Sequence, residues 1–483
     1  MTRLATCLLA AAAVLVARPI PAGADFIEYA VGDGLVFILQ GKATANPGRT
    51  VTFRHAKFGN LYFSLYDVKI HKVPTLSQQY EKLVAKANLK KDADEMFQAG
   101  IWALRHGMLD KHYAAVDKAL EFDPKHAESL RIRKLKAEMD KPLPESSVEE
   151  SELRAFVPRP QMRIATSKHF ILLYDTPDQP DKEKGQKRPR HEERLELLEQ
   201  VYESFLLTFF SRGVDLEVPK ERLKVVLFNN YADFKDFSVR LDATLINAAG
   251  FYMPEVNISF FFDHGTDERF EALQQMNKDM EARIKELVRA RRGGEYIRLA
   301  NTLKLLTRLA QESQDIEVVS HEATHQLAGN TGLFPRHVRV PSWVHEGLAA
   351  YFESPNDGAW SGIGAVNKRR IQYYRALEPD REHSNIDFIV GDQIFDYAGN
   401  IGSTLHGYGQ AWALTHFLME KHFDKFITYY RKLGEFPPDM TIAPEMLTTL
   451  FNEVFGSDRG PLDGEWRSYM RSLKTDIEQV IGD

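Results

Sequence analysis

Two histidines four residues apart, on a segment of helical character, carry the strongest chemical signal in this chain. Residues 316–327 contain His321, Glu322 and His325 in the pattern H-E-x-x-H. On a helix this spacing puts both imidazoles on one face, about 6 Å apart along the axis, so both can direct a nitrogen to one zinc ion. Glu322 can then reach a metal-bound water and take its proton as the water attacks a carbonyl.

A second helix is predicted downstream, with Ser342 as its N-cap. Glu346 on this helix is separated from His325 by residues 326–345, enough chain for a loop and an antiparallel return. Its carboxylate would complete a site of two histidines and one glutamate with one open position, as in catalytic zinc sites. Because Gly347 has no side chain, we expect it to let this helix approach the H-E-x-x-H helix closely.

These residues resemble the gluzincin zinc metallopeptidases and, more closely, the DUF1570 family of bacterial secreted proteins. The resemblance rests on the sequence HEATH, on WVHEGLAAYF after it and on the later segment YGQAWAL, and it covers residues 162–480. It implies that His321, His325 and Glu346 are zinc ligands and that Glu322 is the general base. The implied fold class is α+β, with a zincin-like domain that combines a mixed sheet with active-site helices.

Two further residues have roles that the pattern leaves open. Gluzincins commonly use a tyrosine or histidine beyond the third ligand to stabilise an oxyanion, and Tyr408 is the candidate here. Alternatively, Tyr408 begins a helix that packs in the core. Glu353 follows Glu346 on the same helical face, where it either orients a ligand histidine by accepting its second N–H or lies at the surface. His345 points about 100° away from Glu346 on a helix and is not expected to bind the metal.

The elements that must position this site are predicted within residues 161–483, which we assign to the metallopeptidase domain. The apolar run 258–262 is either a core strand or the sheet edge along which an extended peptide binds. The charged stretch 267–292 predicts a long solvated helix. The other main elements are two strands and an amphipathic helix, at residues 170–174, 223–228 and 195–210.

The residues before this domain divide into three predicted parts. Residues 25–75 contain short β-prone runs separated by Gly, Asn and Pro, and they resemble a small SH3-like barrel. Residues 76–141 are helical. Within them, 93–126 resembles one tetratricopeptide unit, which would serve as a peptide-binding surface or, as a single unit, pack as a helical hairpin on its neighbours. Residues 142–160, rich in proline and glutamate, predict an exposed linker.

Residues 1–24 are predicted to be a secretory signal peptide. Arg3 precedes the apolar run 4–17, and small residues come just before Asp25, where we expect cleavage. An uncleaved anchor is the alternative, although the run is shorter than the roughly 20 residues of a spanning helix. Cys7 is the only cysteine, so the mature chain would contain no disulfide. We therefore expect a secreted, periplasmic or envelope protein.

Composition narrows the classes of function. The chain has 483 residues, of which 43% are hydrophobic and 27% charged, with a net charge of −6. These values are typical of a folded globular protein and show no basic excess for nucleic-acid binding. We expect a zinc-dependent peptidase with a peptide or protein substrate. The alternatives are a zinc hydrolase of other amides or esters, and a non-enzymatic protein that binds partners through its N-terminal region.

Overall fold

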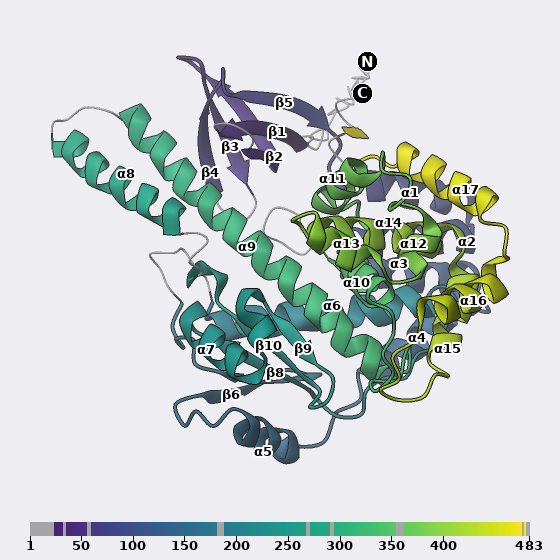
Figure 1. The fold of residues 1–483 in the computed structure, drawn as a ribbon. Coiled ribbons are helices and arrows are strands. Elements are labelled where there is room, and N and C mark those ends of the chain that lie inside the picture. The colour runs from purple at the N-terminus through teal and green to yellow at the C-terminus, as the bar shows by residue number, and fades with distance from the viewer. Residues whose placement is uncertain are drawn as a thin grey trace, which may run out of the picture.

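The computed structural model describes residues 24–31, 35–55, 59–180, 188–266, 271–289, 294–353, 362–475 and 478–479. The chain is a mixed α+β protein with an N-terminal antiparallel sheet, a central mixed sheet and a largely helical C-terminal half (Figure 1). None of the helices among these residues combines the length and apolar content that crossing a bilayer requires. The signal peptide predicted for residues 1–24 lies outside the described residues, apart from Ala24, and stays a prediction.

The first sheet is antiparallel and has the strand order β4-β3-β2-β1-β5. Its strands are β1 (Ala24–Val31), β2 (Leu35–Asn46), β3 (Thr50–His55), β4 (Gly59–Ser64) and β5 (Val68–Val73). The predicted β region is thus confirmed, but no barrel closure is seen, because β4 and β5 are unpaired edges in the described part of the chain. The apolar face, with Phe53 and Phe63, is covered instead by Leu306 and Leu309 of a long helix.

Four helices follow, and they share one hydrophobic core with one face of the mixed sheet and with the C-terminal helices. They are α1 (Leu76–Lys90), α2 (Ala93–Arg105), α3 (Leu109–Phe122) and α4 (Ala127–Met139). The pair α2 and α3 packs closely at Gly100, where an added Cβ would lie 3.1 Å from the Ala115 Cβ. The helical prediction for 76–141 is therefore confirmed. A tetratricopeptide likeness of the α2–α3 pair is not confirmed by these contacts.

The predicted linker, 142–160, contains a packed helix, so the prediction of a wholly exposed segment was wrong. Helix α5 (Ser147–Phe156) lies against the mixed sheet, and Leu153 is fully buried. The four glutamates and the prolines of the segment 142–160 suggested exposure. The apolar residues Leu153 and Phe156, spaced three apart, instead cover one face of the sheet.

The mixed sheet has the order β6-β7-β8-β10-β9 and is buried on both faces. Its strands are β6 (Arg163–Thr166), β7 (Phe170–Tyr174), β8 (Leu223–Phe228), β9 (Phe251–Met253) and β10 (Ile258–Phe262). Alternate residues point to opposite faces, as the period of two requires. Phe261 faces the main core, whereas Phe260 and Phe262 face the side covered by α5 and α7 (Tyr231–Leu241).

The idea that residues 258–262 form a sheet edge is wrong. Strand β10 pairs in parallel with β8 and antiparallel with β9, so both of its sides are occupied. The three consecutive phenylalanines are core residues, and the edge on this side of the sheet is β9. A run that is apolar at every position is typical of a strand buried on both faces.

Helix α9 (Gly294–Asn330) runs through the centre of the molecule and touches most of its parts (Figure 1). Its N-terminal half packs on α8 (Glu271–Arg289) and on the antiparallel sheet, where the Tyr62 backbone N–H donates to the Thr302 hydroxyl at 2.7 Å. Its C-terminal half lies on the mixed sheet beside α6 (Arg190–Phe210). The predicted charged helix is present as α8 in the described part of 267–292.

The C-terminal half is helical and encloses buried aromatic side chains. Two single-turn 3-10 helices, η1 (Ala243–Asn247) and η2 (His264–Thr266), precede it. Its helices are α10 (Ser342–Phe352), α11 (Lys368–Leu377), α12 (Ile386–Val390), α13 (Ile394–Asn400), α14 (Leu405–Lys421), α15 (Phe423–Leu433), α16 (Pro444–Phe455) and α17 (Arg459–Ser472).

One half-buried ionic cluster joins the N-terminal helices to this half. Glu420 of α14 pairs with Arg105 at the end of α2, and with Arg212 just after α6 at 3.3 Å. The Tyr351 hydroxyl donates to the same carboxylate at 2.8 Å. Burial opposes ionisation of Glu420, but Arg105 and Arg212 overcome it and lower its pKa to about 2.

Replacing Glu420 with glutamine should therefore destabilise the fold by about 2 to 3 kcal/mol at neutral pH. Because the folded-state pKa is depressed, this stabilisation is fully present above the usual glutamate pKa and is lost as pH falls toward 2. Urea unfolding of the wild type and of Glu420→Gln at pH 7 and pH 3 measures the effect. The gap between the two proteins should shrink by roughly half at pH 3. An equal gap at both values would contradict the prediction.

Candidate metal centre

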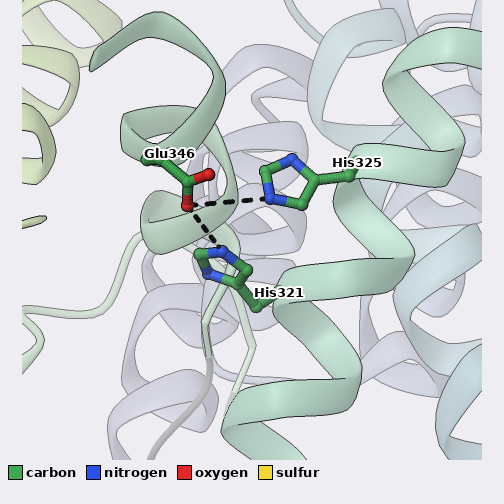
Figure 2. A group of neighbouring side chains, drawn as sticks. All are labelled: His321, His325 and Glu346. Atoms are coloured by element: carbon green, nitrogen blue, oxygen red, sulfur yellow. Dashed lines mark hydrogen bonds and ion pairs between the residues drawn. The ribbon is translucent and has the colours of Figure 1, made fainter. Parts of the chain in front are cut away.

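His321, His325 and Glu346 come together at the contact of α9 and α10, and we call them the His2Glu cluster. One potential ligand atom of each residue lies within 4.8 Å of the others. Both histidines project from α9 toward the Glu346 carboxylate on α10 (Figure 2). His321 Nε2 lies 2.9 Å from Glu346 Oε2, and His325 Nε2 lies 3.8 Å from the same oxygen. Among the described residues, this is the one group with the geometry of a metal site.

The local sequence explains why α9 presents these side chains inward. Val319, Ala323 and Leu327 are buried in the main core and fix the rotation of the helix. His321 and His325, one turn apart, then face α10, with ring centroids 4.7 Å apart and planes at 88°. Two imidazoles at this angle present their Nε2 atoms to one point, as a shared cation requires.

Two contacts that position helix α10 differ from those predicted from the sequence. Its N-terminal amides are capped by the distant Asp392, which accepts from Ser342 and Trp343 at 2.9 and 3.0 Å, so the predicted Ser342 cap is wrong. Gly347 faces α14 instead of α9. A Cβ there would lie 2.3 Å from the Thr415 hydroxyl oxygen, so α10 and α14 cross at this glycine.

Glu353 lies behind the cluster and orients His321. Its side chain is buried, and Oε1 accepts from His321 Nδ1 at 2.9 Å. Of the two readings left open, the surface position is therefore wrong, and Glu353 lies where it can orient the His321 ring. Asn367 Nδ2 and Arg370 Nε donate to the other oxygen of Glu353 at 2.7 and 2.8 Å, and a second Arg370 nitrogen donates to Oε1.

Sequence reasoning missed Asn367 and Arg370. Arg370 lies in a run of three basic residues, which suggests a solvated surface, yet its side chain is almost fully buried. Its guanidinium also sits over the Tyr408 ring, 4.9 Å from the centroid. No local motif identifies these residues, because the loop and helix that carry them meet Glu353 only in the folded chain.

The electrostatics of the cluster favour an ion pair. Burial opposes a charge on His321, but hydrogen bonds to Glu346 and Glu353 raise its pKa well above the usual value. The Glu346 pKa is held well below normal, because His325 and His321 outweigh the effect of burial. Burial, together with the nearby His345, lowers the His325 pKa to about 3, so His325 is neutral and offers a lone pair.

His345 stacks on His325 instead of joining the cluster. The two rings are nearly parallel, at 12°, with centroids 3.7 Å apart. Its Nδ1 lies 3.7 Å from Glu346 Oε1, whereas the cluster meets at Oε2. His345 is not among the residues grouped by ligand geometry, as the sequence analysis expected.

Glu322 lies beside the cluster, on the side of strand β9. Burial raises the pKa of its carboxyl group to about 7, with Glu346 adding to the effect and His321 opposing it. A hydrogen bond from the Tyr252 backbone, in the middle of edge strand β9, also reaches this carboxylate. The group is thus near the point of half-ionisation at neutral pH, which suits a residue that accepts and returns a proton.

Tyr408 faces the cluster from α14. Its ring centroid lies 6.1 Å from that of His321. The charge of Glu346, burial and the charge of Glu322 raise the pKa of the phenol above normal, so the hydroxyl stays protonated and can donate. The side chain is partly exposed. Tyr408 therefore lies in the first turn of α14, which begins at Leu405, and its ring is directed toward the His2Glu cluster.

Three other histidines lie apart from the cluster. His416 is buried and bonded to the Tyr469 hydroxyl at 2.8 Å, and His406 packs on Tyr373. His337 lines a cavity near His325. None of them belongs to the group with ligand geometry.

Comparison with known proteins gives one match. Residues 315–439 fit the family model described as "Protein of unknown function (DUF1570)". The chain is similar to that family over this stretch. The stretch contains the His2Glu cluster, Glu322 and Tyr408, and it is shorter than the 162–480 over which the resemblance was expected. No curated protein and no solved structure gives a significant match.

Proposed function

We propose that this chain is a secreted zinc-dependent peptidase of the gluzincin type, whose metal centre is the His2Glu cluster in the DUF1570 region. The observation that supports this is that His321, His325 and Glu346 converge within 4.8 Å. The carboxylate of Glu322, on the same helix as the two histidines, lies beside this group without being part of it. Two imidazoles and a carboxylate form the donor set of catalytic zinc sites such as those of metalloproteases.

The residues present fit a divalent cation in their chemistry as well as in their number. His325 is neutral, and Glu346 is ionised. Glu353 fixes the His321 ring through Nδ1, which leaves Nε2 free to bind a metal once its proton is released. When bound, zinc would act as a Lewis acid toward water and a carbonyl oxygen.

The chain's own residues supply the remaining steps of hydrolysis. Glu322 is proposed to accept a proton from water and later return it to the leaving amine, for which a pKa of about 7 is suited. The protonated Tyr408 hydroxyl is proposed to donate a hydrogen bond to the oxyanion of the tetrahedral intermediate. Arg370 positions both Glu353 and the Tyr408 ring.

Strand β9 offers a place for the substrate backbone. It is an edge strand, and its Tyr252 backbone hydrogen-bonds to Glu322. A peptide added to this edge would therefore pass beside the proposed base.

Metal content and hydrolysis together test the proposal. Purified protein should contain about one zinc per chain by elemental analysis and should cleave members of a mixed peptide library. A chelator should abolish cleavage, and added zinc should restore it. Zinc with hydrolysis only of esters or non-peptide amides would favour another hydrolase. A protein with neither bound metal nor hydrolysis would instead be a binding protein that retains this fold.

A further inference from the structure

A cavity of about 460 Å³ opens beside the metal centre, lined by His325 and His345 on one side and by the loop 331–341 on the other. This loop joins α9 to α10 and is anchored by apolar side chains. Phe334 and Val338 are buried, whereas Arg336 and Arg339 are exposed and line the cavity. The loop thus presents two cations to the space next to the proposed reaction centre.

The stem of Arg336 is held against α9 by close packing. A Cβ added to Gly329 would lie 2.8 Å from the Arg336 Cγ and 3.5 Å from the Tyr252 hydroxyl oxygen. Gly329 follows His321 and His325 at the same four-residue spacing, so it continues the face of α9 that carries the cluster. Arg336 therefore lies one turn beyond the metal centre, between α9 and strand β9.

Arg336 also lines a second, larger cavity of about 1720 Å³, formed mainly by α4, α5 and the segment 215–224. Glu255 is shared by both cavities as well. The two cavities therefore adjoin at Arg336. A substrate that extends from the metal centre toward the larger cavity would pass its guanidinium.

In the part of the chain that the structure describes, neither arginine of this cavity has an anionic partner. Within the described ranges, no carboxylate lies within 4.0 Å of the Arg336 or Arg339 guanidinium. Of the acidic residues in the lining, Asp392 already accepts from the α10 amides, and Glu255 and Asp439 are exposed. By contrast, Arg370 at the metal centre is fully paired. An unpaired guanidinium with a fixed stem is suited to bidentate recognition of a carboxylate.

We propose that Arg336, assisted by Arg339, binds a carboxylate of the substrate, so that this site takes peptides with an acidic group close to the scissile bond. The inference rests on the proposed peptidase function and specifies its substrate class. The carboxylate belongs either to an Asp or Glu side chain or to the C-terminus of the peptide. Both have the same chemistry, and the experiment separates them.

Peptide binding to the full chain carrying Glu322→Gln, which prevents turnover, tests this proposal by isothermal titration calorimetry. The probes are alanine-rich octapeptides with a single Glu or Gln moved through each position, made with a free or an amidated C-terminus. A Glu at one position should bind about tenfold more tightly than Gln if a side chain is recognised. A free C-terminus should bind about tenfold more tightly than the amide if the terminus is recognised.

Three further variants decide whether Arg336 is responsible. Arg336→Gln should abolish the preference, Arg336→Lys should keep part of it, and Arg431→Gln should leave it unchanged, because Arg431 is an exposed arginine outside this cavity. Raising the salt concentration should weaken the preference. The proposal would be overturned if the Glu and Gln peptides, and the free and amidated peptides, bound with equal affinity, or if no probe bound. It would also be overturned if the preference survived in Arg336→Gln.

These outcomes are distinct from failure of the peptidase proposal. If the protein binds no zinc and cleaves nothing, but prefers the acidic probes through Arg336, the carboxylate site stands and the peptidase function falls. If it is a zinc peptidase without any such preference, only the carboxylate site is wrong.

Discussion

Glu322→Gln should lower kcat for peptide hydrolysis by about 10²- to 10⁴-fold while the zinc content stays at that of the wild type. The substitution keeps the shape of the side chain and removes its ability to accept a proton. Glu322 makes no contact that holds His321, His325 or Glu346 together, so the cluster should remain intact. The measurements are kcat on a peptide cleaved by the wild type and zinc per chain by elemental analysis.

A matched control is Glu435→Gln, which changes an exposed carboxylate outside α9, α10 and α14, the helices that carry the site. Its activity should equal that of the wild type. If Glu322→Gln kept most of the wild-type kcat, Glu322 would not be the base. If it lost zinc along with activity, Glu322 would have a structural part in the cluster that its present contacts do not indicate.

Zinc affinity should fall in a graded way as carboxylates are removed around His321. Glu346→Ala deletes one of three protein ligands and should weaken zinc binding by more than a hundredfold. Glu353→Gln leaves all three ligands but weakens the acceptor that orients His321, so the loss should be about 10- to 100-fold. Competition with a chromophoric zinc chelator measures both effects.

His345→Ala is the neighbouring control for this series. His345 adjoins Glu346 and stacks on His325, yet it is outside the cluster, so affinity should change by no more than about threefold. If His345→Ala lost much zinc affinity and Glu346→Ala lost little, His345 and not Glu346 would be the ligand. Circular dichroism of each variant distinguishes a lost ligand from a lost fold.

Much of the candidate site follows from local sequence. The four-residue spacing of His321 and His325, with Glu322 between them, needs only a helix to place two imidazoles on one face. Glu346 lies in α10 and Glu353 directly follows the end of this helix, and both carboxylates reach His321. Apolar periodicity likewise predicted α6, β7 and β8, because the spacing of buried residues directly reflects helix or strand geometry.

Predictions failed where a residue's neighbour is distant in sequence. The same apolar run, 258–262, is compatible with an edge or a central strand, and only the pairing of β10 with β8 and β9 decides between them. Composition suggested a linker over 142–160, but Leu153 is buried because the sheet has a face that needs covering. The first amides of α10 donate to the side chain of Asp392, which no pattern near Ser342 reveals.

Sequence alone therefore determined which side chains can meet a metal, because helical spacing is a short-range property of the backbone. Tertiary structure decided what surrounds them. Arg370 and Asn367 reach Glu353, and Gly347 lets α14 pack closely on α10. Arg336 lies beside the cluster with no carboxylate partner among the described residues. These contacts join segments far apart in the chain, and they depend on how helices and sheets pack, which local spacing does not encode.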